Sequence, residues 1–182
     1  ASTFNESLLT KFFLSQDIER DMHIYLLCRE IDNFRGTLYR QTMFAEFEHR
    51  VYEVAENNQP LTIETFQEIY KGLLELYFGS GLVLDDCLLL ECFRIPHFYF
   101  SFYVYKYATG ISAAYALADR VLSGGEQELG DYLNFLKSGG SKYPIDLLKD
   151  AGVDMSSPEP INTALLKFSV LVDELENLTL KN

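Results

Sequence analysis

Residues 94–110 read RIPHFYFSFYVYKYATG, and they continue as ISAAYALADRVLSGG up to residue 125. Four of the chain's 12 tyrosines and one of its three histidines fall in the first stretch. The apolar spacing predicts one long helix over residues 97–122, which Ser123, Gly124 and Gly125 would end. Because aromatic side chains would occupy nearly every side of this helix, we expect it to be buried.

The rest of the chain also shows helical spacing, and no sustained alternation indicates a sheet. The expected first helix has an apolar stripe formed by Leu8, Leu9, Phe12 and Phe13. A later helix is expected to open at Thr62 or Thr65 and to stop at Gly79. The other helices are expected near residues 1–14, 15–33, 37–56, 85–92, 126–137, 144–151 and 161–178. The sequence therefore predicts an all-α fold of about seven to eight helices in a single domain over residues 1–182.

Composition excludes several classes of protein. A content of 48% hydrophobic and 23% charged residues is that of a globular chain, and the net charge of −12 opposes nucleic-acid binding. No apolar run reaches the roughly 18 to 20 residues that cross a bilayer, and no signal peptide is visible, so we expect a cytoplasmic protein without membrane contact. The three cysteines, Cys28, Cys87 and Cys92, lie mostly among apolar residues, which indicates reduced core thiols and no structural zinc.

The common catalytic motifs are absent. The three histidines begin HIYLL, HRVYE and HFYFS, so none starts an HExxH metal pair. We find no glycine-rich phosphate loop and no GxSxG elbow. The sequence therefore predicts no metal site within this chain.

Two interpretations of the aromatic segment remain open at this point. The tyrosines could fill a core with their hydroxyls paired, since an unpaired buried hydroxyl costs about 1 to 3 kcal/mol. Alternatively, the hydroxyls and the His97 imidazole could converge on a cleft and donate hydrogen bonds to a developing oxyanion. Pro96 favours a cleft position for His97, because proline begins a helix and the next side chain can project from the first turn.

Several segments together resemble one family. RIPHFYFSFYVYKYATG and its continuation, YLNFLKSGGSKYPIDLLKDAGVDM at 132–155, RQTMFAEFE at 40–48 and the opening ASTFNE are similar to the C-terminal part of oligoendopeptidase F. That family consists of zinc metallopeptidases of the thimet oligopeptidase type. The resemblance spans the chain and implies the C-terminal segment of a larger all-helical zinc peptidase.

The resemblance also implies where the metal is held. In the family, zinc is bound by two histidines of an HExGH helix and by a glutamate in a segment similar to Glu-Val-Ala-Ser-Thr-Phe-Asn-Glu. This chain matches that segment from Ala1 onward, so the third ligand would lie two residues before Ala1. No zinc is therefore expected in this chain. Glu6 would face the same way as the missing ligand and support it, or would be a solvated carboxylate.

Related peptidases bind the substrate carbonyl with a histidine and tyrosines from a late helix. By resemblance these are His97, then Tyr103 and Tyr105, whose Tyr-Val-Tyr is similar to the family's Tyr-Gly-Tyr, and then Tyr99. The expected function is a zinc endopeptidase for short peptides in the full-length protein. The segment alone would be inactive, would need the N-terminal part of the enzyme as its partner, and would self-associate through exposed cleft walls. The alternative is a non-enzymatic helical interaction domain that resembles the peptidase.

Overall fold

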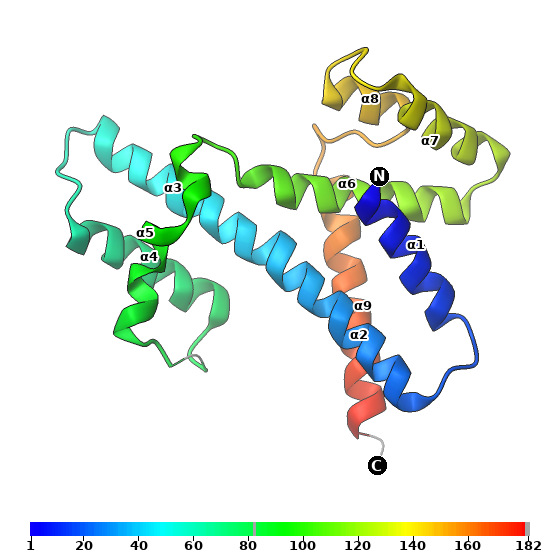
Figure 1. Ribbon diagram of the computed structural model, residues 1–182, viewed down its shortest axis with the longest axis horizontal. Coiled ribbons are helices and arrows are strands. Elements are labelled where there is room, and N and C mark those ends of the chain that lie inside the picture. Colours follow the sequence, from blue (N-terminus) through cyan, green and yellow to red (C-terminus); the bar gives the residue numbers. More distant parts are fainter. Residues whose placement is uncertain (82, 181–182) are drawn as a thin grey trace. The chain divides into compact units, whose positions relative to one another are not determined.

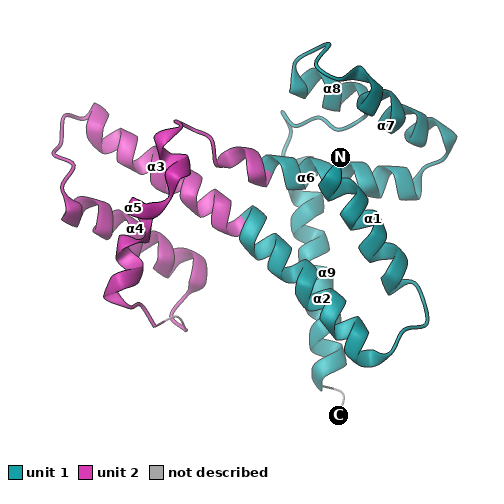
Figure 2. Ribbon diagram, viewed as in Figure 1, with its two compact units in different colours: residues 1–38, 109–182 teal, residues 39–108 magenta. Residues whose placement is uncertain are grey.

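The computed structural model describes residues 1–81 and 83–180, and every element within them is helical. These residues fall into two compact units, which Figure 2 colours separately. Unit 1 comprises residues 1–38 and 109–182, and unit 2 comprises residues 39–108. The predicted all-α class is confirmed, whereas the single domain over residues 1–182 stays a prediction. No helix in the described part of the chain combines the length and apolar character needed to cross a membrane.

Unit 1 joins two stretches that are far apart in the sequence. Its helices, which can be followed in Figure 1, are α1 (Ser2–Leu14), α2 (Arg20–Phe34), the part of α6 (Tyr105–Ser123) after residue 108, α7 (Glu126–Ser138), α8 (Pro144–Asp150) and α9 (Glu159–Leu180). Helix α2 packs along α9, and α7 packs against α8. The predicted helices of this unit are therefore present, although α2 begins later than expected.

The buried face of α1 differs from the predicted stripe. Phe12 and Phe13 are 56% and 42% exposed, whereas Phe4, Ser7 and Thr10 are buried. Leu8 of the predicted stripe does pack against the core cluster that contains Phe4. Two of the three buried residues carry hydroxyls, however, so hydrophobicity alone did not identify the whole buried face of this helix.

Gly36 does not end a helix. The sequence predicted separate helices on its two sides, but residues 35–39 form the π-helical turn η1 (Arg35–Tyr39) between α2 and α3 (Arg40–Glu56). Glycine weakens a helix by about 1 kcal/mol relative to alanine without preventing it, so this glycine was a poor boundary signal.

Unit 2 is organised around α3 and α4 (Ile63–Phe78). Thr62 caps α4 by accepting a hydrogen bond from the Thr65 backbone N–H at 3.3 Å, so the first of the two predicted starts is the correct one. Gly79 ends the helix with a φ of 70°, a conformation that glycine adopts without steric cost. The short elements η2 (Asp86–Leu90), α5 (Glu91–Arg94) and η3 (Pro96–Tyr99) follow.

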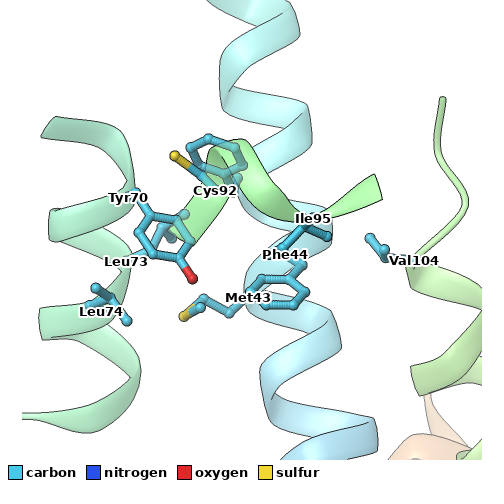
Figure 3. Packing of buried hydrophobic residues seen from close by; sticks show 9 residues of the cluster. Met43, Phe44, Tyr70, Leu73, Leu74, Cys92, Ile95 and Val104 are labelled. Atoms are coloured by element: carbon cyan, nitrogen blue, oxygen red, sulfur yellow. The ribbon is translucent and has the colours of Figure 1, made fainter. Parts of the chain in front are cut away.

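The hydrophobic core of unit 2 lies between these elements. Helix α4 contributes Tyr70, Leu73 and Leu74, and α3 contributes Met43 and Phe44, as Figure 3 shows. The segment after α4 completes this core with Cys92, Ile95 and Val104. Ile95 and Val104 lie on either side of residues 96–103. The core therefore fixes both ends of this stretch, which carries part of the candidate site.

A buried carboxylate links three elements of this unit. Glu91 is only 7% exposed, and its Oε1 accepts hydrogen bonds from Arg40 Nη2 at 2.5 Å and from Arg94 Nη2 at 2.7 Å. Its Oε2 accepts a bond from the Tyr70 hydroxyl at 2.6 Å. Burial raises the pKa of Tyr70, and the hydrogen bond to Glu91 and the charge of Glu91 raise it further.

The aromatic segment is not the long buried helix that the sequence predicted. Residues 96–99 form the 3-10 turn η3, residues 100–104 are non-helical, and α6 begins only at Tyr105. Tyr99 is 81% exposed, and Phe102 adopts a φ of 54° that a helix cannot contain. This segment therefore lies largely at the surface of unit 2.

The cysteines differ from one another in exposure. Cys28 and Cys87 are exposed, so the prediction of core thiols holds only for Cys92. Burial raises the pKa of Cys92 to about 11, which keeps it in the unreactive thiol form at neutral pH.

We therefore expect an alkylating reagent at about pH 8 to label Cys28 and Cys87 of the native chain quickly, and Cys92 only after unfolding. Peptide mass spectrometry over a time course measures the three rates. Labelling of Cys92 at the rate of Cys28 would contradict the burial described above.

Candidate active site

The 3-10 turn η3 places His97 at the surface of unit 2. Pro96 occupies the first position of this turn, and Ile95 before it is extended, with φ −85° and ψ 106°. This conformation is typical of a residue that precedes proline. Ile95 is buried in the core, with only 8% of its surface exposed. His97 therefore lies two residues after a position that the core holds in place.

Tyr103 and Tyr107 are positioned by the start of α6. Val104 is 1% exposed and anchors the chain in the core immediately after Tyr103. Helix α6 then begins at Tyr105 and carries Tyr107 in its first turn. The two tyrosines are thus four residues apart across a helix start.

His97, Tyr103 and Tyr107 form one cluster, which we call the His97 cluster. The ring centroids are 5.5 Å apart for His97 and Tyr103, 5.9 Å for His97 and Tyr107, and 5.8 Å for the two tyrosines. The Tyr107 hydroxyl lies 3.2 Å from His97 Nε2, within hydrogen-bonding distance. Lys106 Nζ lies 5.1 Å from the centre of the Tyr103 ring.

The hydroxyls of this cluster are suited to donate hydrogen bonds. A hydrogen bond with Tyr103 raises the pKa of Tyr107, and burial and the proximity of Tyr103 add to the effect. Tyr103 and Tyr107 are 39% and 38% exposed, which leaves their rings accessible to a ligand. Two phenols and an imidazole within one cluster can therefore hold an oxygen atom that gains negative charge.

A largely apolar cavity of about 290 Å³ lies in the same unit. Aromatic side chains from α3, α4, α5 and η3 line most of it, including Phe66, Phe98 and Tyr99. Glu48 and Tyr52 of α3 also line it. Tyr99 therefore faces a cavity shared with these residues.

The other predicted site residues lie outside the His97 cluster. Tyr105 opens α6 and is 47% exposed. Glu6 is exposed on α1 in unit 1 and accepts a hydrogen bond from the Ser2 hydroxyl at 2.9 Å. The proposed roles of Tyr99, Tyr105 and Glu6 stay predictions.

Tyr107 is the residue that sequence reasoning missed as a candidate. It follows Tyr103 at a spacing of four residues, which would place both side chains on one face of the helix that the sequence predicted there. The resemblance of Tyr-Val-Tyr to the family's Tyr-Gly-Tyr favoured Tyr105 over Tyr107.

The chain does not itself provide a metal centre in the part that the structure describes. Within residues 1–81 and 83–180, no group of three or more His, Cys, Asp and Glu side chains is placed to hold a metal ion. The imidazole and the two phenols of the His97 cluster are groups that can donate hydrogen bonds.

Comparison with known proteins gives a consistent assignment. The sequence model of Peptidase family M3 matches residues 1–166. The chain is 49% identical over 181 residues to oligopeptidase PepF of Bacillus subtilis (strain 168), covering 100% of this chain and 27% of that protein. It is 40% identical over 181 residues to the chromosomal oligoendopeptidase F of Lactococcus lactis subsp. cremoris, covering 100% of this chain and 30% of that protein.

A solved structure agrees with these relatives. The crystal structure of oligoendopeptidase-F from Enterococcus faecium matches with a TM-score of 0.96 and 40% identity, covering 100% of this chain and 35% of that one. The chain thus spans about a third or less of the proteins it matches and corresponds to their C-terminal part, which confirms the resemblance to oligoendopeptidase F. A match of this extent shows that the chain belongs to peptidase family M3.

Proposed function

We propose that this chain is the substrate-binding and oxyanion-stabilising segment of a metalloendopeptidase that hydrolyses internal bonds of short peptides. The observation that carries the proposal is the His97 cluster, in which two accessible tyrosine hydroxyls and an imidazole meet in a chain of peptidase family M3. Hydrolysis of a peptide bond turns the carbonyl oxygen into an oxyanion, and donors held in advance stabilise that charge.

Each member of the cluster has a distinct task in this proposal. Tyr103 donates a hydrogen bond from its hydroxyl to the carbonyl oxygen as negative charge develops, and it keeps its proton. Tyr107 lies beside both Tyr103 and His97 and orients them through its ring contacts and its hydroxyl. Tyr105 and Tyr99 remain candidates for binding the peptide on either side of the cut.

The metal of the intact enzyme, which we take to be zinc, would be held by residues outside this chain. Glu6 is proposed to support that site through its position on α1. The N-terminal part of the enzyme is the corresponding partner. Self-association of the isolated chain and a cytoplasmic location stay predictions.

A comparison of two proteins tests this function: the 182-residue chain, and the longer protein with HExGH and a glutamate two residues before Ala1. We expect the longer protein to cleave a quenched fluorescent peptide and to contain about one zinc per chain by elemental analysis. The isolated chain should show neither property.

The result can contradict the proposal in two ways. Stoichiometric zinc with two or more ligands from residues 1–182 would overturn the assignment of the metal site. A longer protein without the HExGH segment, or without peptidase activity when loaded with zinc, would favour the non-enzymatic interaction domain.

A further inference from the structure

The segment of residues 100–104, which we call the strap, connects η3 to α6 and carries Tyr103. It contains no glycine, yet Phe102 adopts a left-handed φ of 54°. A side chain with a Cβ atom is disfavoured in this conformation, so the surrounding structure must hold it. The question is which residues do so.

Glu48 of α3 provides the first restraint. Its Oε1 accepts a hydrogen bond from the backbone N–H of Phe102 at 2.6 Å, although the two residues are 54 positions apart. Glu48 is only 4% exposed, and its Oε2 is buried without a hydrogen-bond partner in the part of the chain that the structure describes. Burying a carboxylate is costly, so the bond to the strap is the contact that compensates it.

Tyr52 provides the second restraint, one turn further along the same face of α3. Its hydroxyl lies 2.9 Å from the Ser101 hydroxyl, and its ring centroid is 5.0 Å from that of Phe102. Two residues of one helix therefore fix positions 101 and 102, and buried Val104 fixes the far side of Tyr103.

We propose that Glu48 is a positioning residue for Tyr103: its carboxylate holds the Phe102 N–H and thereby aims the Tyr103 hydroxyl within the His97 cluster. The inference rests on the proposed function and adds a residue of α3, outside the His97 cluster, that acts through the backbone of the strap. A hydrogen bond to the backbone next to a reacting group sets its orientation, and small errors in orientation lower the rate of the chemical step.

The experiment compares two substitutions of similar length in the full-length peptidase. Glu48→Met removes the acceptor, whereas Glu48→Gln keeps an acceptor oxygen for the Phe102 N–H. We expect Glu48→Met to lower kcat by about tenfold or more with KM within about threefold of wild type. Glu48→Gln should retain kcat within about threefold, and Glu53→Met, at an exposed position of the same helix, should behave as wild type.

A second measurement follows the strap without relying on activity. Chymotrypsin cleaves after aromatic residues, so the rate of cleavage after Phe100, Phe102 and Tyr103 reports opening of the strap. We expect faster cleavage at these sites in Glu48→Met only, with other sites unchanged.

These outcomes separate the inference from the function on which it rests. Wild-type kcat in Glu48→Met, equal losses in Glu48→Met and Glu48→Gln, or accelerated cleavage throughout unit 2 would each overturn the positioning role. If Tyr103→Phe keeps full activity, the proposed role of Tyr103 fails, and the cleavage pattern still decides whether Glu48 holds the strap.

Discussion

Replacement of Tyr103 by phenylalanine is expected to lower kcat of the full-length peptidase by about ten- to a thousandfold, with little change in KM. The substitution keeps the ring, which packs 5.5 Å from His97 and 5.8 Å from Tyr107, and removes only the hydroxyl. A donor that acts mainly on the developing oxyanion contributes little to binding of the ground state. Its loss therefore appears in kcat and in kcat/KM to the same extent.

Matched variants show whether the effect belongs to the cluster. Tyr107→Phe should also lower kcat, since it removes the hydroxyl that lies 3.2 Å from His97 Nε2. Tyr143→Phe, at a position 81% exposed in unit 1, should leave both constants unchanged. Steady-state kinetics on one peptide substrate, with circular dichroism as a check of folding, provides the comparison.

Two results would reassign these tyrosines. Unchanged kcat in both Tyr103→Phe and Tyr107→Phe would leave them with a packing role only. A loss in Tyr105→Phe alone would instead support the Tyr-Val-Tyr correspondence that the sequence suggested.

Local sequence signals predicted the helices well because apolar spacing and capping are local properties. Thr62 begins α4 and Gly79 ends it, each through contacts within a few residues, and the sequence predicted both positions. Gly36 misled the prediction because a helix tolerates glycine when its neighbours continue the pattern. The buried face of α1 was predicted only in part because Ser7 and Thr10 are buried there in place of larger apolar residues.

The break in the aromatic segment had no local signal. Residues 97–103 contain neither glycine nor proline, and the left-handed Phe102 depends on Glu48, 54 positions away. A contact over that distance is invisible to a window of neighbouring residues. The resemblance supplied His97 and Tyr103 as candidates, while the position of Tyr107 beside them is seen only in the structure.

The second large effect concerns stability rather than catalysis. Glu91→Ala is expected to destabilise unit 2 by about 1 to 3 kcal/mol, because it leaves the buried hydroxyl of Tyr70 without its acceptor. Arg40 would lose the carboxylate at 2.5 Å, and the hydroxyl of Tyr70, a residue with no exposed surface, would lose its acceptor at 2.6 Å. Glu91→Gln keeps the shape and one acceptor, so a smaller loss is expected.

The same unit contains a matched control with the same chemistry at the surface. Glu46 accepts hydrogen bonds from Arg50 Nη2 at 2.5 Å and from the Tyr77 hydroxyl at 2.9 Å, but its side chain is 32% exposed. Burial, and then the bond to Glu46, raises the pKa of Tyr77 to about 12. Since water can replace the lost partner there, Glu46→Ala should cost only about 1 kcal/mol or less.

Hydrogen exchange of peptides from α4, read by mass spectrometry in increasing urea, measures the two losses locally. The free energy of unfolding of unit 2 should also depend on pH, since Tyr70 has a raised pKa in the folded state. The contribution of Tyr70 to stability is fully present below its unfolded pKa of about 10 and is lost as pH rises toward its folded pKa.

Equal losses of stability for Glu91→Ala and Glu46→Ala would mean that burial does not determine the strength of these networks. A larger loss for Glu91→Ala would instead show that the core supporting the His97 cluster depends on one buried carboxylate.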